Sequence, residues 1–473
     1  MGKWGYEMPF WQLQTHADRP ALIQGDTVTR YRQLADLADA WQNDVLPAHA
    51  SFGLLQMPNH VQAIACYLAC LRSGKHAPLL LSASTSAEQI AQLAAHYQPD
   101  WLLLTDDTPA PAGYSLHHHC EGLSFYRLPT ATPKPQHPAL ALLLSTSGST
   151  GSSKLVRLSA SALDSNAQAI LEYLGLHAED RAITTLPLAY SFGMSILNSH
   201  LAVGGAVVLT DASMMDRNFW EAARTHSITS LSGVPATYEM LHRLGLHRLG
   251  LDKLRMLTQA GGRLRDDLIR AFAQTCRRMD IQFHVMYGQT EAAPRISHVP
   301  PERLADKIGS IGIAIPGGEM AIDPDNTELI YRGPNVMLGY AETRADLALG
   351  DCQQGELRTG DLARQDDDGY FYITGRLKRF LKISGNRINL DDVERLLANQ
   401  LGQQVCCTGK DDALAVFTTE PAPPEQIRSL LQQHYRIFQG HVNSFTLEAM
   451  PKMASGKIDY HALQQHAATE PRP

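Results

Sequence analysis

The sequence has no run of about 18 consecutive apolar residues, the length that a helix needs to cross a membrane. It has no basic tail and carries a net charge of -7, which disfavours a polyanionic partner such as DNA. Its 7 cysteines include no CxxC pair of the metal-binding type, and residues 1–11 lack the features of a secretory signal. We therefore expect a cytoplasmic protein with reduced thiols, no membrane span and a small ligand in place of a nucleic acid.

The composition is that of a globular protein, with 44% hydrophobic and 19% charged residues. From residue 21 to about 349, short apolar runs alternate with amphipathic stretches, as at 53–58 and 60–74. Such alternation of strands and helices predicts an α/β fold, in which a large N-terminal domain consists of helix-covered β-sheets.

A second, smaller part of the chain is indicated after residues 376–380. There the sequence reads as a hairpin followed by a helix that Asn389 would cap at its N-terminus. The remaining length suits an independent α+β domain. We therefore predict domains at 1–377 and 378–473.

A loop rich in Ser, Thr and Gly follows an apolar strand predicted at 139–145 and ends with Lys154. Glycines let a backbone approach a ligand closely, hydroxyl groups donate hydrogen bonds and a lysine adds positive charge, so the loop suits a polyphosphate. It is not a Walker A motif, and a flexible linker is the alternative interpretation. The candidate phosphate-binding residues are Ser145, Thr146, Ser147, Gly148, Ser149, Thr150, Gly151 and Lys154.

Three further motifs follow in order, namely MYGQTE at 286–291, RTGDLARQDDDGYFYITGR at 358–376 and PKMASGKI at 451–458. Together with the loop they resemble the motifs of the adenylate-forming superfamily, which includes acyl-CoA synthetases, adenylation domains of peptide synthetases and luciferases. The resemblance covers almost the whole chain. It implies an enzyme that uses ATP and Mg²⁺ to convert a carboxylic acid into an acyl-adenylate and pyrophosphate. The acyl group then passes to the thiol of coenzyme A or of carrier-protein phosphopantetheine.

The resemblance also implies a nucleotide site. Tyr287 would stack on adenine, Thr290 would bind the α-phosphate, and Glu291 would supply the hard oxygen ligand that Mg²⁺ prefers. Asp361 would accept hydrogen bonds from both ribose hydroxyls, with Arg376 near the ribose and phosphates. Further nucleotide contacts are implied for Gly261, His284 and Gly288, and His284 falls where the family often has Asn.

In the family, the small domain is mobile and takes part in both the adenylation step and the thiol step. The resemblance implies roles in these steps for four positions. Lys457 would be the catalytic lysine of adenylation, because a positioned ammonium stabilises the negative charge that develops at the α-phosphate. Lys378 would be the hinge about which the domain rotates. Ser384 and Gly385 would then lie along the path of the thiol.

The acyl pocket implied by the resemblance contains small, apolar or neutral polar residues. They are Tyr190, Ser191, Met194, Ser195 and Gly233, with Gly261 and Gly262 as the floor. Adenylation domains that activate amino acids place an Asp nearby, but no acidic residue occurs between Arg181 and Thr210. We therefore expect an uncharged aliphatic or aryl acid and not an α-amino acid.

Other functions stay open. A carrier protein would act in trans, since no carrier domain follows Lys457. A non-catalytic nucleotide-binding relative and a luciferase-like oxygenase, which shares the adenylation step, are the alternatives to a ligase. The segment HHHC at 117–120 is expected to be a solvated loop and not a metal site.

Overall fold

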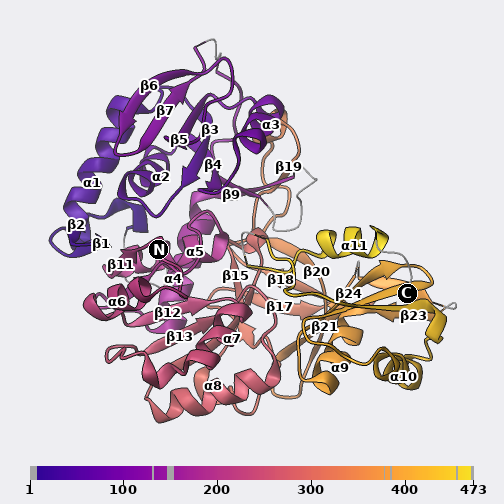
Figure 1. Cartoon of the computed structure of the whole chain (residues 1–473). Helices are drawn as coiled ribbons and strands as arrows, with labels where there is room; N and C mark the ends of the chain where they lie inside the picture. The colour runs from indigo at the N-terminus through magenta and orange to yellow at the C-terminus, as the bar shows by residue number, and fades with distance from the viewer. Residues whose placement is uncertain are drawn as a thin grey trace. The chain divides into compact units, whose positions relative to one another are not determined.

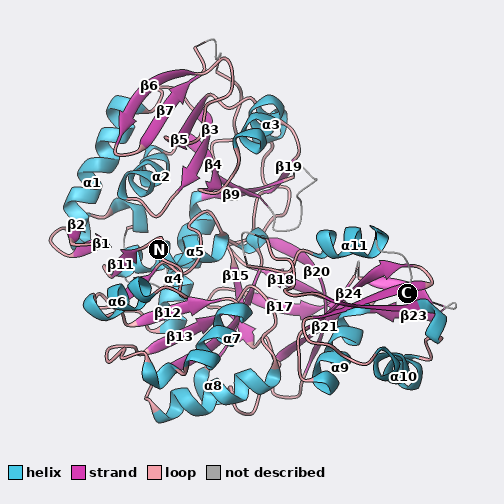
Figure 2. Ribbon diagram, viewed as in Figure 1, coloured by secondary structure: helices cyan, strands magenta, loops and turns pink. Residues whose placement is uncertain are grey.

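The computed structural model describes residues 8–129, 133–145, 154–377, 379–383, 386–453 and 456–469. The chain divides into two compact units, of which the first comprises residues 1–319 and 331–357 and the second residues 320–330 and 358–473. Figure 1 shows the course of the chain and Figure 2 its secondary structure. None of the described helices is long and apolar enough to cross a membrane.

The first unit contains an eight-stranded sheet in the order β19-β9-β8-β4-β3-β5-β7-β6. Its strands are β3 (Ser51–Met57), β4 (His76–Ser82), β5 (Trp101–Thr105), β6 (Ser115–Cys120), β7 (Leu123–Arg127), β8 (Leu140–Ser145), β9 (Leu155–Ser159) and β19 (Gly339–Ala341). The central strands are parallel, and every residue of β3 is buried. This burial explains the largely apolar sequence of β3, because a strand covered on both faces does not alternate apolar with polar residues.

A second sheet of the first unit has nine strands in the order β16-β15-β14-β13-β12-β10-β11-β1-β2. Its strands are β1 (Pro20–Gln24), β2 (Thr27–Arg30), β10 (Arg181–Ile183), β11 (Ala206–Leu209), β12 (Ser230–Gly233), β13 (Met256–Gln259), β14 (Gln282–Gly288), β15 (Arg295–Val299) and β16 (Ile313–Ala314). Strands β12, β13 and β14 are parallel neighbours. Their carboxyl ends therefore meet at one edge, where α/β folds place ligands.

Helices cover both sheets, as the prediction of an α/β fold requires (Figures 1 and 2). They are α1 (Tyr31–Ala40), α2 (Val61–Ser73), α3 (Ala87–Tyr97), α4 (Ala160–Leu174), α5 (Ser191–Val203), α6 (Arg217–Thr225), α7 (Pro235–Leu244) and α8 (Asp266–Arg278). Helices α4 and α5 pack on each other, and α4 contacts β8 and β9 whereas α5 contacts β10 and β11. This helix pair therefore joins the two sheets.

The second unit has three sheets. They comprise the four-stranded sheet β17 (Glu319–Ile322), β18 (Glu328–Arg332), β20 (Glu356–Gln365) and β21 (Phe371–Arg376), the hairpin β22 (Phe380–Ile383) and β23 (Asn386–Asn389), and the sheet β24 (Val405–Lys410), β25 (Ala413–Thr418) and β26 (Val442–Thr446). The helices are α9 (Leu390–Leu401), α10 (Pro424–Tyr435) and α11 (Tyr460–Thr469). Asn389 caps α9 as predicted, because its side chain accepts a hydrogen bond of 2.9 Å from the amide of Asp391.

The compact units do not coincide with the domains expected from the sequence. Strands β20 and β21 belong largely to the second unit, and the side chain of Asn389 donates to the carbonyl of Thr374 at 3.1 Å. The proposed boundary at 377/378 thus falls within that unit, and its role as a hinge stays a prediction. The segment 117–120, expected to be a loop, lies instead in the edge strand β6, whose side chains are mostly exposed.

Candidate functional site

The two ends of the predicted phosphate loop lie side by side. Strand β8 ends at Ser145 and pairs antiparallel with β9, so that Ser145 is opposite Leu155, the residue after Lys154. The predicted loop residues Thr146, Ser147, Gly148, Ser149, Thr150 and Gly151 lie outside the described residues. The sheet therefore holds both anchors of the loop.

Lys154 is linked to the YGQTE motif through Tyr340. Its Nζ atom lies 3.6 Å from the centre of the Tyr340 ring, and the Tyr340 hydroxyl donates to Oε1 of Glu291 at 3.0 Å. Burial, reinforced by the Glu291 charge, raises the pKa of Tyr340, which keeps the hydroxyl protonated as a donor. Three segments far apart in sequence thus bring a lysine and a carboxylate to one tyrosine. Tyr340 is not among the residues that the sequence predicts.

The predicted α-phosphate ligand lies beside the predicted acyl pocket. The hydroxyls of Thr290 and Ser191 are 3.2 Å apart, and both residues are buried. Ser191 is the first residue of α5, and the next turn carries Met194, whose amide donates to the carbonyl of Tyr190 at 2.9 Å, and Ser195. The structure therefore places the start of α5 against the YGQTE motif.

The predicted glycines lie where side chains would collide. At Gly261, which has a φ of +82°, an added Cβ would be 2.9 Å from the Tyr190 hydroxyl. A Cβ at Gly233 would be 2.5 Å from the side chain of Thr237, and one at Gly262 would be 3.2 Å from Pro235. These close approaches bring Tyr190 and Gly261 together, as the predicted pocket requires.

Strand β14 carries three predicted nucleotide residues with different surroundings. The Tyr287 hydroxyl accepts a hydrogen bond of 3.1 Å from the side chain of Gln289. Gly288 has no room for a Cβ, which would be 1.9 Å from the carbonyl oxygen of Pro294. His284 is only 1% exposed, neither of its ring nitrogens has a partner among the described residues, and burial lowers its pKa to about 3. Its position beside adenine therefore stays a prediction.

Two predicted residues of the second unit form an ion pair. Asp361 and Arg376 are opposite each other on β20 and β21, with Nε of Arg376 3.0 Å from Oδ1 of Asp361. The Asp361 side chain is 5% exposed, whereas that of Arg376 is 61% exposed. The carboxylate is thus fixed in place by its neighbour on the next strand.

The predicted catalytic lysine lies before α11. The backbone carbonyl of Lys457 accepts a hydrogen bond of 2.8 Å from the amide of Met453, and Gly456 has a φ of +78°. The bridge between Lys452 and Ile458 flanks this hydrogen bond on both sides. The predicted hinge and thiol-path residues Lys378, Ser384 and Gly385 lie outside the described residues.

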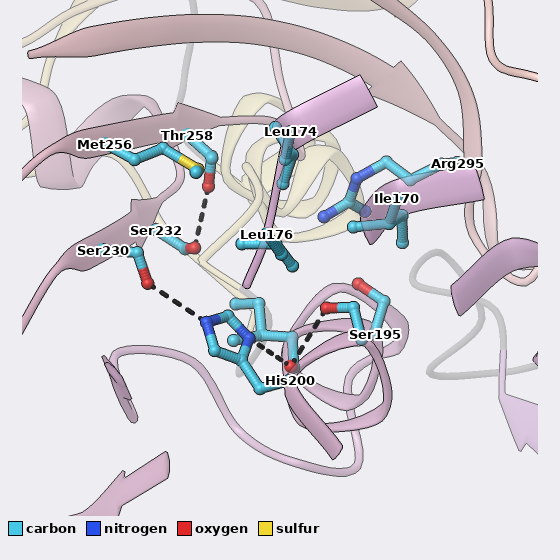
Figure 3. A pocket seen from close by; sticks show the side chains of 12 residues that line it. Ile170, Leu174, Leu176, Ser195, His200, Ser230, Ser232, Met256, Thr258 and Arg295 are labelled. Carbon is cyan, nitrogen blue, oxygen red and sulfur yellow. Dashed lines mark hydrogen bonds between the residues drawn. The ribbon is translucent and has the colours of Figure 1, made fainter. Parts of the chain in front are cut away.

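The first unit also contains a small cavity. Figure 3 shows its lining, to which α4, α5, β12, β13 and β15 contribute. Ser195 belongs to this lining, and so does Arg295, a buried arginine that is not among the residues that the sequence predicts. The guanidinium of Arg295 lies 4.2 Å from the ring centre of Phe192, the residue after Ser191.

Comparison with known proteins decides the family. The model of the AMP-binding enzymes matches residues 10–341. The chain belongs to this family. It is 30% identical to indoleacetate–CoA ligase of Aromatoleum aromaticum over 71% of this chain and 68% of the relative, and 27% identical to 2-succinylbenzoate–CoA ligase of Bacillus pumilus over 97% and 98%.

A solved structure supports the fold of this family member. The o-succinylbenzoate coenzyme A synthetase of Bacillus subtilis, in complex with an acyl-adenylate intermediate, matches with a TM-score of 0.77 and 20% identity, over 98% of this chain and 99% of that chain. The α/β fold and the adenylate-forming superfamily predicted from the sequence are therefore confirmed.

Proposed function

We propose that this enzyme joins a carboxylic acid to the thiol of coenzyme A in two steps. In the first, an oxygen of the acid attacks the α-phosphorus of ATP, and pyrophosphate leaves. In the second, the thiol attacks the carbonyl carbon of the acyl-adenylate, AMP leaves and the thiol proton is released. The class of AMP-forming acid–thiol ligases is also that of the relatives, which are named as CoA ligases.

The observation that carries this proposal is the contact of Tyr340 with both Lys154 and Glu291. It connects the end of the phosphate loop to the motif that would hold Mg²⁺. Glu291 uses Oε1 for the Tyr340 hydroxyl, and its Oε2 accepts no hydrogen bond from the described residues. A carboxylate oxygen of this kind suits Mg²⁺, which would neutralise phosphate charge when bound.

The other residues have roles that follow from their chemistry. The Thr290 hydroxyl, paired with that of Ser191, would donate to the α-phosphate beside the acyl pocket. Asp361, held by Arg376, would accept the ribose hydroxyls, and Lys457 would stabilise the negative charge of adenylation. We propose rotation about the 377/378 boundary, with Lys378 as hinge and Ser384 and Gly385 along the thiol path.

The proposal also names the cellular compartment in which the enzyme acts and the thiol that accepts the acyl group. All of the cysteines are free thiols, so a reducing compartment such as the cytoplasm suits the protein. The names of the relatives favour coenzyme A as acceptor. Carrier-protein phosphopantetheine, acting in trans, presents the same thiol and is distinguished by experiment.

The test is exchange of labelled pyrophosphate into ATP over a panel of acids, followed by thioester formation with coenzyme A or with a loaded carrier protein. We expect exchange that requires both acid and Mg²⁺, and AMP as the product. Release of ADP would indicate an acyl-phosphate mechanism and contradict the proposal. Nucleotide binding without exchange would indicate a non-catalytic relative, and oxygen consumption with light emission would indicate a luciferase-like oxygenase.

A further inference from the structure

Arg295 is a buried cation without a carboxylate partner. Its side chain belongs to the first residue of β15, the residue is 3% exposed, and no Asp or Glu of the described residues forms an ion pair with it. Its Nε has no hydrogen-bond partner among those residues. A guanidinium stays charged at physiological pH even where burial lowers its pKa, as it does here. A buried charge is costly unless it is paired, so this one calls for an anionic partner.

The protein groups around this cation are neutral. The titratable groups that act on it are the hydroxyl of Tyr173, which is hydrogen-bonded to the guanidinium, and that of Tyr190. Burial raises the pKa of both, to about 12 for Tyr190. The ring of Phe192 supplies a cation–π contact at 4.2 Å, which is weaker compensation than a carboxylate. The described surroundings of Arg295 therefore supply neutral contacts but no negative charge.

The backbone of Arg295 is held in place, and its guanidinium is directed into the cavity. The backbone of Arg295 is fixed by the side chains of Asn166 and Asn335, which both donate to its carbonyl, at 3.2 and 2.8 Å. Figure 3 shows its nitrogens pointing toward the space bordered by Ile170 and Leu176. A side chain positioned in this way is prepared for a ligand and not for solvent.

The cavity shares Ser195 with the proposed acyl site. Ser195 in its wall lies one turn along α5 from Ser191, whose hydroxyl is 3.2 Å from that of Thr290. Tyr190, which Gly261 approaches closely, is within electrostatic reach of Arg295. An acid whose reacting carboxylate lies at Thr290 would thus extend its far end toward the guanidinium.

We propose that Arg295 selects acids that carry a second carboxylate, which the guanidinium binds at the far end of the acyl pocket. This inference rests on the proposed function and names its substrate class. It replaces the uncharged acid expected from the sequence. A guanidinium can form two parallel hydrogen bonds with a carboxylate, and the leucine, isoleucine and methionine side chains of the wall suit a short apolar body between the two acid groups.

The test compares matched pairs of acids in the exchange of pyrophosphate into ATP. The pairs are butyrate with succinate, hexanoate with adipate, and 3-phenylpropionate with 3-(2-carboxyphenyl)propionate. We expect the wild type to favour the diacid of at least one pair by about 10- to 100-fold in kcat/KM, the range for a charge-assisted hydrogen bond. Arg295→Met should abolish or invert that preference, whereas Arg295→Lys, which retains the charge, should keep part of it.

Two controls separate a binding role from a structural one. Arg217→Met makes the same substitution at a side chain that is 87% exposed and should leave the preference and the Tm unchanged. Without ligand, Arg295→Met should not lower the Tm, because it removes a buried charge that no carboxylate of the described residues neutralises. If Arg295 were structural, the variant would melt at a clearly lower temperature and lose activity with both members of each pair alike, which would overturn the inference.

The outcomes also distinguish this inference from the proposed function. Exchange with monoacids but not with diacids would overturn the inference and keep the ligase. An equal loss for both acids in a fully folded Arg295→Met variant would show that Arg295 binds the reacting carboxylate, and would overturn it as well. Exchange with no acid of either kind would contradict the ligase function itself and remove the basis of the inference. If Arg295→Met does not fold, the wild-type preference and Arg295→Lys decide.

Discussion

Replacing Tyr340 by Phe tests the link between the predicted phosphate loop and the predicted metal-binding motif. The substitution removes the hydroxyl that donates to Glu291 at 3.0 Å and keeps the ring that lies 3.6 Å from Nζ of Lys154. A hydrogen bond to a charged group contributes about 1.5–3 kcal/mol, and water replaces part of it because Tyr340 is only half-buried. We expect a loss of about 1–2 kcal/mol, or roughly 5- to 30-fold in kcat/KM for MgATP.

Tyr340→Leu provides the second step of the same experiment. It removes the ring as well, and a cation–π contact of this exposure adds about 0.5–1 kcal/mol. The loss should therefore be larger than for Tyr340→Phe by roughly two- to fivefold. Pyrophosphate exchange at varied ATP and at varied Mg²⁺ measures both variants. The Tyr340→Phe variant should need more Mg²⁺ for half-maximal exchange, because the Glu291 carboxylate is less well oriented.

Tyr372 offers a matched control in the second unit. Its hydroxyl donates to Asp366 at 3.1 Å, and the guanidinium of Arg364 lies 4.1 Å from its ring centre. Tyr372→Phe thus removes the same kind of hydrogen bond outside the proposed site and should leave the Mg²⁺ requirement unchanged. Equal Mg²⁺ dependence of Tyr340→Phe and wild type, in protein that melts at the same temperature, would refute the orienting role of Tyr340.

Three further predictions concern other residues. Asp361→Ala should weaken ATP binding by roughly 1.5–3 kcal/mol, because the ribose hydroxyls lose a charged acceptor, and calorimetric titration with ATP would measure it. Lys457→Ala should abolish adenylation but spare thioester formation from supplied acyl-adenylate. Lys378→Pro should spare adenylation but impair thioester formation. Equal loss of both steps in both folded variants would contradict the two-orientation mechanism. Burial opposes the charge of Asp180, but its hydrogen bonds with Arg255 prevail and lower the pKa of Asp180 below the ordinary 3.8. The stability that the Asp180 carboxylate contributes is therefore complete above pH 3.8 and is lost as the pH falls through the lowered pKa. Asp180→Asn should cost about 3–5 kcal/mol near pH 7, and urea unfolding from about pH 5 down to about pH 2 should show a smaller loss of stability on acidification than in the wild type.

Much of the candidate site could be proposed from the sequence because its residues lie in contiguous motifs. The YGQTE segment contains both Thr290 and Glu291, and the apolar strand before the Ser/Thr/Gly loop is β8. Such motifs are local, so their strand and loop character is visible in the order of residue types. The family and the fold followed from these motifs.

Tyr340 and Arg295 could not be predicted because their significance depends on contacts between distant segments. Tyr340 reaches Lys154 only because β19 pairs antiparallel with β9, where Tyr340 is opposite Val156. Arg295 opens a strand whose five residues are all buried, and the order of residues does not reveal what lies over its side chain. The strand at 117–120 was not predicted from the sequence for a different reason. Edge strand β6 is mostly exposed, so it lacks the alternation of apolar and polar residues that indicates a strand.

Burial alone does not explain why Arg295 is assigned to a ligand, since Arg157 in the same unit is 0% exposed. The difference lies in the hydrogen bonds. Arg157 donates to the backbone carbonyls of Leu338 and Tyr340, each at 3.1 Å, and to those of Leu349 and Gly350. Its side chain thereby holds the segment that carries Tyr340 against β9, so its polar groups are used within the protein. Arg295 has comparable burial, but its guanidinium contacts only a tyrosine hydroxyl and an aromatic ring, and its Nε has no partner among the described residues. Such a buried donor is best explained by an acceptor that arrives with the substrate.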